Sequence, residues 1–163
     1  GNERVFYRLA RLVAASNPNS INENLKYNKK LFKDVTTSEV GTRAAWLKDT
    51  FLPHLVATVS LAQKKQMHPL DIRGSSAGGI GLPQFLPGNV DRYGVDGHGH
   101  QLLDLNKPAD AIMSVANFLR ENGWKHFDLN TAEKREVLFR YNQSTPYVDT
   151  LIAMSAQLSK SMR

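Results

Sequence analysis

Residues 74–87, G-S-S-A-G-G-I-G-L-P-Q-F-L-P, are the most informative stretch of this chain, because four glycines, two serines and a glutamine lie there among apolar residues without any charge. Glycine is typical of places where the backbone takes a positive φ or where another group approaches closely. Ser75, Ser76 and Gln84 offer uncharged donors and acceptors, which suit a neutral ligand rich in hydroxyl and amide groups. The stretch therefore predicts a ligand-binding loop or, alternatively, a tight connection without a ligand.

A nucleotide site is not indicated by this loop. It lacks the lysine of the G-x-x-x-x-G-K-[ST] phosphate loop, and no strand rich in valine or isoleucine precedes it. Nucleic-acid binding has little support either, because no single motif carries the net charge of +6 and no base-reading helix is recognisable. Both an ordinary solvated surface and attraction to an anionic wall or membrane surface explain this charge.

Apolar residues recur at helical spacing through most of the chain. Three predicted helix faces consist of Val5, Leu9, Leu12 and Val13, of Ile112, Val115, Phe118 and Leu119, and of Val148, Leu151, Ile152 and Leu158. No alternating apolar run of useful length predicts a substantial sheet. The sequence therefore predicts a mostly α domain with long loops in the middle of the chain, at residues 70–105.

Local signals predict where several helices begin. Ser20 and Glu23 form the S-x-x-E pattern of a capping box. Pro108 stands where a first-turn proline is expected, and Thr145 with Pro146 gives the same signal for the last helix.

Other signals predict where helices end. Pro53 has no N–H for the helical ladder, so it should break or kink the helix that carries Trp46 and Leu47. Residues 37–65 are therefore expected to form a pair of helices. Gly123 is expected to terminate another helix.

Length and composition set wider limits. A chain of 163 residues is about one domain and is long enough to bury a core. It has no cysteine, which excludes disulfides and thiolate metal sites. Arg4, Arg8 and Arg11 interrupt the first apolar residues, so these residues predict neither a membrane span nor the core of a signal peptide.

Several blocks of residues stand out along most of the chain: G-N-x-R-V-F-x-x-L-A-x-L-V at 1–13, residues 74–87, Y-G-V-D at 93–96, D-A-I-M-S-V-A-N-F-L at 110–119, G-W at 123–124, and residues 138–151 with Y-N-Q-S at 141–144. In this order they resemble the membrane-bound lytic murein transglycosylase B family. Residues 16–42 have no clear counterpart. We therefore expect one lytic-transglycosylase-like domain over residues 1–163 with an insertion at 16–42.

The resemblance implies a lysozyme-like helical fold and an enzyme that binds peptidoglycan glycan strands in the periplasm or cell envelope. Such an enzyme cleaves the bond between muramic acid and glucosamine without water and leaves a 1,6-anhydromuramyl product. The alternative is a catalytically inactive module that binds peptidoglycan or serves as a structural part of an envelope assembly, with protein partners there. No cofactor is implied, and the oligomeric state stays open.

Five residues are carried over from the resemblance by motif. Ser75 and Gln84 resemble substrate-contacting residues, and Tyr141, Asn142 and Tyr147 resemble groove-lining residues. Tyrosine offers a ring face and a hydroxyl to a sugar, and amides bond N-acetyl groups. The structural alternatives are hydrogen bonds to the loop backbone for the first two, core packing for the tyrosines, and a cap or turn for Asn142.

The catalytic residue itself is not located in this chain. In the resembling family a glutamate acts first as acid and then as base, and its position would fall ahead of Gly1. Glu3 is the nearest carboxyl, but it stands at a variable position of the matched segment. Glu23 and Glu39 are better explained by a capping box and by a first-turn carboxylate. The chain either lacks the acid or binds glycan without cutting it.

The loop D-G-H-G-H-Q-L-L-D at residues 96–104 replaces a longer acidic stretch of some relatives. His98 stands where an aspartate would be expected, and calcium prefers several hard oxygen ligands, so weak or no calcium binding is expected. His98 and His100 with Asp96 could hold zinc, although two histidines in such a loop are more often exposed polar residues. The sequence therefore predicts no metal.

Overall fold

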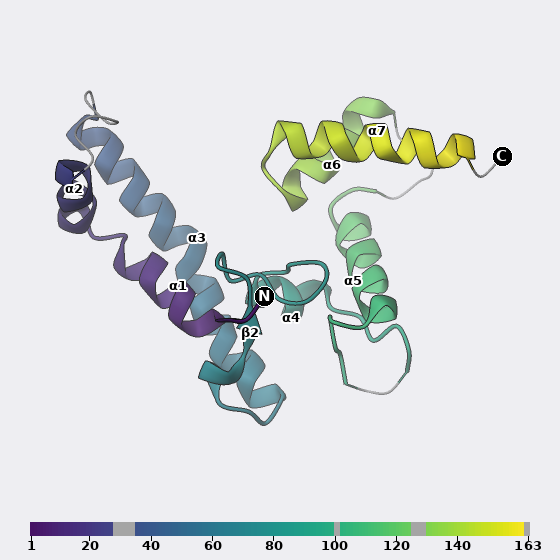
Figure 1. Cartoon of the computed structure of the whole chain (residues 1–163), viewed down its shortest axis with the longest axis horizontal. Coiled ribbons are helices and arrows are strands. Elements are labelled where there is room, and N and C mark those ends of the chain that lie inside the picture. Colours follow the sequence, from purple (N-terminus) through teal and green to yellow (C-terminus); the bar gives the residue numbers. More distant parts are fainter. Residues whose placement is uncertain (28–34, 100–101, 125–129, 162–163) are drawn as a thin grey trace.

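Figure 1 shows the fold as a computed structural model that describes residues 1–27, 35–99, 102–124 and 130–161. The helices in these residues are α1 (Val5–Ala14), α2 (Pro18–Tyr27), α3 (Thr37–Lys64), α4 (Pro87–Tyr93), α5 (Pro108–Glu121), α6 (Thr131–Tyr141) and α7 (Thr145–Ser161), with a 3-10 turn η1 (Pro69–Asp71). Two short strands, β1 (Glu3–Arg4) and β2 (Arg73–Gly74), pair antiparallel. The predicted mostly α architecture is confirmed.

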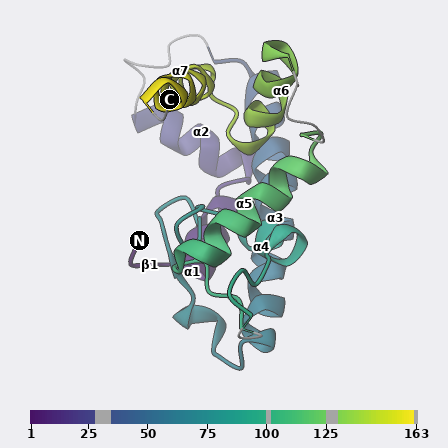
Figure 2. The same cartoon turned by 90° about the vertical axis from the view of Figure 1, so that its right-hand side faces the viewer.

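The long helix α3 organises one half of the molecule. α1, α2 and α4 all contact α3, and α5 then connects α4 to α6, which packs on α7. In Figure 1, α1 to α3 lie on one side and α6 and α7 on the other, with the chain after β2 between them. Figure 2 shows α5 running past α4 toward α6, and it contacts both helices. Residues 74–87 therefore lie where the two sides of the fold meet.

The core extends from α1 across this meeting point. Its buried members are Val5, Leu9, Leu61, Ala62, Ile72, Phe85, Val90, Tyr93, Leu105 and Phe118. The ring of Phe85 packs against those of Tyr93, Phe118 and Tyr141, with centroids 5.9 to 6.3 Å apart. Phe85 belongs to the glycine-rich loop and is only 3% exposed. The loop is therefore anchored in the core by its own aromatic residue.

The predicted pair of helices at residues 37–65 is wrong, because α3 continues through Pro53 as one helix. The missing N–H of Pro53 deprives only the carbonyl of Asp49 of its helical partner, and both residues are exposed to water. Packing of α3 on α1, α2 and α4 favours the continuous helix. The capping box of Thr36 and Glu39 fixes its start, which confirms Glu39 as a first-turn carboxylate.

The capping box predicted at Ser20 and Glu23 is also wrong. α2 begins at Pro18, and the side chain of Asn17 accepts a hydrogen bond from the amide of Asn19 at 2.9 Å. An asparagine before a first-turn proline thus supplies the start signal three residues earlier than expected. The starts at Pro108 and Thr145 and the termination at Gly123, with φ of 118°, are confirmed.

Two further corrections concern the middle of the chain. Ile112 is 66% exposed, because the inward face of α5 consists instead of Asp110, Ala111, Ser114 and Phe118. The predicted long loops at residues 70–105 also contain α4, with Pro87 in its first turn.

Among the helices of the described residues, none is long and apolar enough to cross a bilayer.

Candidate functional site

The glycine-rich loop contains a tight turn at residues 80–85. Ile80 and Phe85 form an antiparallel bridge, in which each amide donates to the carbonyl of the other, at 2.8 and 3.2 Å. Gly81 and Gln84 both take left-handed backbone angles, with φ of 66° and 54°. Such a φ is ordinary for glycine but uncommon for glutamine, and strain of this kind clusters at binding sites.

The exposed side chain of Gln84 is oriented by the turn itself. Its Nε2 donates to the carbonyl of Gly81 at 2.8 Å, and its backbone amide donates to the same oxygen at 3.2 Å. The amide of Leu82 donates to the carbonyl of Leu105 at 2.8 Å, which ties the turn to the segment ahead of α5. Gln84 therefore presents a preset amide group at the surface.

Ser75 closes the first half of the loop. Its hydroxyl accepts a hydrogen bond from the amide of Gly79 at 3.1 Å, and its amide donates to the carbonyl of Gly79 at 2.8 Å. A Cβ added to Gly79 would lie 2.9 Å from Oε1 of Gln84, so Gly79 contacts that side chain. The structure thus brings Ser75 and Gln84 together, and both hydrogen-bond to the loop backbone, as the structural alternative expects.

Tyr141, at the end of α6, is joined to the turn by a hydrogen bond. Its hydroxyl donates to the carbonyl of Pro83 at 2.5 Å, and its ring packs edge-on to Phe118 with centroids 5.1 Å apart. Burial, with a smaller contribution from Tyr147, raises the pKa of Tyr141 to about 12. The phenol is therefore neutral near physiological pH, and its hydroxyl donates a hydrogen bond to the turn.

Asn142 and Tyr147 lie in the connection from α6 to α7. Asn142 caps the end of α6 with its side chain exposed, and its carbonyl accepts from the amide of Ser144 at 2.7 Å. Tyr147 is half-buried in the first turn of α7, close enough to Tyr141 to affect its pKa.

These contacts bring Ser75, Gln84 and Tyr141 into one region, and Tyr147 lies near enough to Tyr141 to affect its pKa. We call these four residues the turn cluster. Asn142 lies next to this cluster along the chain. The sequence positions come from a loop and from two helices more than fifty residues later, and the carbonyl of Pro83 links them. Whether they contact a substrate stays a prediction.

The N-terminus lies against the same loop. Glu3 of β1 stands opposite Gly74 of β2, and a Cβ on Gly1 would lie 2.2 Å from the carbonyl oxygen of Gly74 and 2.7 Å from Cα of Ser75. The side chain of Glu3 is exposed. A carboxyl that stays protonated near neutral pH needs a desolvated position, so Glu3 does not have the environment of a general acid.

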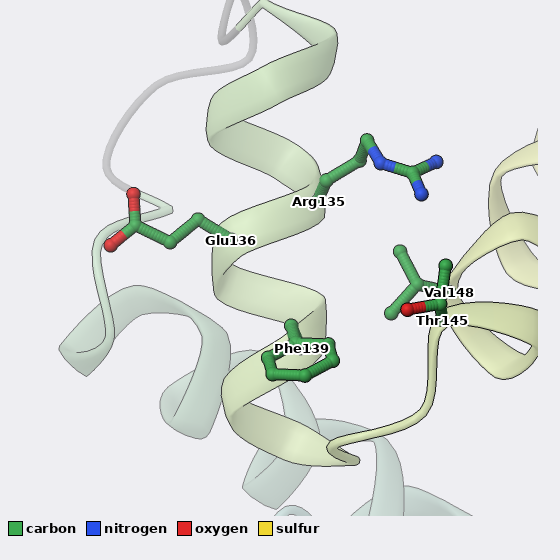
Figure 3. A pocket seen from close by; sticks show the side chains of 5 residues that line it. All are labelled: Arg135, Glu136, Phe139, Thr145 and Val148. Carbon is green, nitrogen blue, oxygen red and sulfur yellow. The ribbon is translucent and has the colours of Figure 1, made fainter.

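A cavity of about 330 Å³ opens between α6 and α7 (Figure 3). It is lined by Arg135, Glu136, Phe139, Thr145 and Val148. The guanidinium of Arg135 points toward α7, where it pairs with Asp149 at 2.5 Å, whereas Glu136 points away. None of the five residues that line this cavity belongs to the turn cluster.

A second polar group, called the aspartate cluster, consists of Asp96, His98, Asp104 and Asp110 before and at the start of α5. Oδ1 of the fully buried Asp110 accepts from the amide of Gly97 at 2.8 Å, and Oδ2 accepts from the amide of Asp104 at 2.7 Å. Burial alone would raise the pKa of Asp110, but these amide bonds and the contact with His98 outweigh it, so the pKa is lowered.

Side-chain ligand atoms of Asp96, His98 and Asp110 lie within 4.8 Å of one another. Their arrangement does not fit zinc: Nδ1 of His98 is 2.5 Å from Oδ1 of Asp110, whereas two ligands of one tetrahedral zinc stand roughly 3.3 Å apart. Nζ of Lys107 lies 3.2 Å from the other ring nitrogen of His98, a further charge that disfavours a cation. His100 lies outside the described residues.

Sequence reasoning missed two residues that shape this region. Arg8 of α1 donates from Nε to the carbonyl of Ser76 at 2.8 Å and so holds the loop from the other side. Asp110 is fully buried, although a carboxylate in a first turn is normally solvated. Its place after Pro108 was visible in the sequence, but its burial depends on contacts with Gly97 and Asp104 that no local pattern indicates.

The profile of the family described as transglycosylase SLT domain matches residues 26–135, about two thirds of the chain. Ser75 and Gln84 lie inside the matched segment, whereas Tyr141, Asn142 and Tyr147 lie beyond it.

Three individual proteins are similar to this chain. Membrane-bound lytic murein transglycosylase B of Escherichia coli (strain K12) is 39% identical over 74 residues, which are 45% of this chain and 20% of that protein. This chain therefore spans about a fifth of that relative. The Escherichia coli lytic transglycosylase SLT35 in complex with bulgecin A has a TM-score of 0.54 at 28% identity, covering 79% of this chain and 32% of its own.

The third is the soluble lytic transglycosylase SltB1 from Pseudomonas aeruginosa. Its TM-score is 0.64 at 20% identity, over 95% of this chain and 80% of its own. At this identity the likeness shows a shared fold, and together with the family match it confirms the predicted lysozyme-like helical fold class.

Proposed function

Because this chain belongs to the transglycosylase SLT domain family, we propose that it is part of a lytic transglycosylase that binds peptidoglycan glycan strands and cleaves the bond between muramic acid and glucosamine. The relatives that support this proposal are lytic transglycosylases by name. The observation that carries it is the turn cluster, where neutral polar groups and tyrosine rings from distant parts of the chain lie together. Such groups suit an uncharged sugar chain with N-acetyl groups.

The reaction requires one carboxyl group in two roles. As an acid, it gives its proton to the glycosidic oxygen, which leaves with the glucosamine as the bond to muramyl C1 breaks. As a base, the resulting carboxylate takes the proton of the muramyl C6 hydroxyl while that oxygen bonds to C1 and closes the 1,6-anhydro ring. No water is consumed, because the substrate's own hydroxyl replaces the nucleophile that a glycosidase activates with a second carboxylate.

In this scheme Ser75 and Gln84 hydrogen-bond the sugar hydroxyl and N-acetyl groups, Tyr147 offers its ring to a sugar face, and Asn142 contributes an amide at the edge. In a longer chain, a glutamate ahead of Gly1 would supply the general acid and base. The position of Gly1 supports this proposal, because it lies against Gly74 and Ser75.

The inactive binding module is the less favoured alternative, because the similar proteins are lytic transglycosylases by name. The proposed substrate places the domain in the periplasm or cell envelope, and protein partners there stay possible under either function. We propose no nucleic-acid partner and no cofactor.

Calorimetric titration with a chitooligosaccharide tests the binding half of the proposal. Gln84→Ala and Tyr147→Ala should each weaken binding by about 1 to 3 kcal/mol, because a polar partner or a stacking ring is lost. The exposed residues Gln63 of α3 and Tyr7 of α1 provide matched controls, and Gln63→Ala and Tyr7→Ala should bind like the wild type. Absence of binding by the wild type, or equal losses in both pairs, contradicts the proposal.

Release of 1,6-anhydromuropeptides from purified sacculi tests the catalytic half. A chain that begins at Gly1 should act at least about 10² to 10⁴ times more slowly than one that carries the preceding glutamate, because the general acid and base is lost. Fast release by the chain from Gly1 onward contradicts the placement of the acid and makes Glu3→Gln the next variant to assay.

A further inference from the structure

His54 of α3 is bonded to the helix that follows the turn cluster. Its Nδ1 accepts a hydrogen bond from the backbone amide of Gly88 at 3.2 Å, across 34 positions of sequence. Gly88 lies in the first turn of α4, directly after the loop that carries Gln84. A Cβ on Gly88 would lie 2.8 Å from Nδ1, so only a glycine lets the imidazole approach this amide.

This contact completes the start of α4. The first amides of a helix have no partner within the helix, and Leu86, the residue at the N-cap, provides no side-chain cap. The carbonyl of Leu86 accepts from the amides of Asn89 and Val90, at 2.8 and 3.2 Å. His54 satisfies the amide of Gly88 from a different helix, and it therefore joins the start of α4 to α3 at Gly88, three residues after the turn.

Only a neutral imidazole can accept this bond, because a protonated ring carries a hydrogen on both nitrogens. The two charged side chains of α4 have partners other than His54: Asp91 pairs with Lys64 of α3 at 2.7 Å, and Arg92 lies 5.1 Å from the ring centroid of Tyr93. Desolvation of the half-buried ring is the one cause that lowers the pKa of His54.

We propose that His54 is a positioning residue for the glycan site, because its neutral ring caps α4 and holds the turn that presents Gln84. Protonation of His54 converts the acceptor into a donor that faces the amide of Gly88, so the start of α4 loses this hydrogen bond to α3 and the turn ahead of it is held less firmly. Glycan binding therefore weakens as the pH falls. This inference rests on the proposed function, and a structural measurement separates the two below.

The direction of the pH effect follows from linkage. The folded-state pKa of His54 lies below its unfolded value of 6.5, so between these two values the unfolded chain binds more protons. Stability is complete above pH 6.5, falls as the pH drops toward the folded pKa, and is then level. Asp104 and Asp110, whose pKa values are lowered from 3.8, stay ionised in this window.

The test titrates wild type, His54→Asn and His54→Ala with an uncharged chitooligosaccharide between pH 7.5 and 4.5. Oδ1 of asparagine takes nearly the place of Nδ1 and accepts the same bond without titrating. Wild type should lose about two- to tenfold in affinity on acidification. His54→Asn should bind like wild type at pH 7.5 with a flat profile, and His54→Ala should be weaker and flat.

His68 is the matched control, because its Nδ1 also accepts a backbone amide, that of Leu70, at 3.2 Å, but its side chain is exposed at η1. His68→Ala should keep the wild-type profile. A wild-type affinity in His54→Ala, or a wild-type pH profile in His54→Asn, overturns the inference.

Amide resonances measured by NMR on the same proteins distinguish this inference from the proposed function. The Gly88 amide of the wild type should shift as the pH falls from 7.5 to 4.5, and the same amide in His54→Asn should not. If the wild type binds no chitooligosaccharide at any pH, the proposed function fails and the Gly88 resonance still decides whether His54 anchors the turn. A Gly88 amide that does not titrate in the wild type overturns the anchor.

Discussion

The turn cluster and the aspartate cluster lie next to each other and are held by opposite kinds of interaction. Backbone amides, a tyrosine hydroxyl and close glycine contacts hold the turn cluster. Buried and partly buried charges hold the aspartate cluster, where Asp110 binds two amides and contacts His98. The surface that we propose for an uncharged sugar thus has no charged residue among its four members, whereas charged side chains stabilise the adjacent loop.

Leu105 connects the two clusters. Its carbonyl accepts the amide of Leu82 from the turn, and its side chain is buried in the core one residue after Asp104. Substitutions in either cluster therefore test whether the two are independent or act through Leu105.

Gly81→Ala should have the largest effect, because it breaks the turn at this connection. Gly81 has φ of 66°, and an added Cβ would lie 2.4 Å from Cβ of Leu105 and 2.5 Å from its carbonyl oxygen. Left-handed strain and overpacking should together lower the free energy of unfolding by about 2 to 4 kcal/mol. Chemical denaturation measures this loss, and chitooligosaccharide binding should disappear with it.

Gly99 provides the control in the neighbouring loop. Its φ is 76°, but no atom lies within 4 Å of an added Cβ. Gly99→Ala should therefore cost only the backbone strain, about 1 to 2 kcal/mol. Equal losses for both alanine variants contradict the expectation that the contact with Leu105 adds to the cost of the backbone strain.

Asp110→Asn should have the next largest effect. It removes a buried charge from the aspartate cluster, and it replaces one carboxylate oxygen, which accepts a hydrogen bond from a backbone amide, by an NH2 group that can only donate. The melting temperature at pH 7 should fall by roughly 5 °C. The folded pKa of Asp110 is lowered, so its stabilising effect is complete above its unfolded value of 3.8 and is lost as the pH falls through the folded value.

The difference between wild type and Asp110→Asn should therefore shrink below about pH 3.8, as thermal melts across pH can show. Chitooligosaccharide binding by the variant at pH 7 and a temperature below its melting transition should equal that of the wild type. A binding loss as large as that of Gln84→Ala shows that the aspartate cluster supports the site, and then the two clusters are not independent.

Gln84→Gly separates stability from binding within the turn. Glycine adopts φ of 54° without strain, so this variant should be more stable than Gln84→Ala by about 1 kcal/mol. Both variants lose the side-chain amide and should bind a chitooligosaccharide equally weakly, by about 1 to 3 kcal/mol less than the wild type. Full binding by Gln84→Gly assigns Gln84 to the loop backbone alone.

Sequence patterns predicted those features of the fold that local chemistry decides. The buried positions Val5 and Leu9, the helix start at Pro108 and the stop at Gly123 follow from apolar spacing, a fixed φ and a left-handed glycine. Pro53 misled the prediction because its local penalty is smaller than the packing of α3 on its neighbours. Tertiary contacts decided that case.

In the candidate site, too, sequence patterns predicted individual residues, whereas the contacts between them depend on the fold. Ser75 and Gln84 were predicted from the unusual composition of the loop as well as from the resemblance, whereas Tyr141, Asn142 and Tyr147 were predicted from the resemblance alone. The bond from Tyr141 to Pro83 spans 58 positions, and the bond from Gly88 to His54 spans 34. The backbone carbonyl of Pro83 and the backbone amide of Gly88 carry no local sequence signal, because an N–H or a carbonyl is present at nearly every position. Such long-range hydrogen bonds become visible only with the fold.

The smallest expected effect belongs to metal, where calcium should leave the melting temperature unchanged. Both carboxylate oxygens of Asp110 already accept hydrogen bonds, and His98 offers a nitrogen where calcium prefers oxygen. A ligand specific for the folded state would add about 2.7 kcal/mol at a hundredfold excess over its dissociation constant, which a melt detects easily. Melts with millimolar calcium, with zinc and with chelator distinguish the cases. A rise with calcium shows that Asp96, Asp104 and Asp110 rearrange into an oxygen site, whereas a rise with zinc alone shows that His98 leaves Asp110 to bind metal.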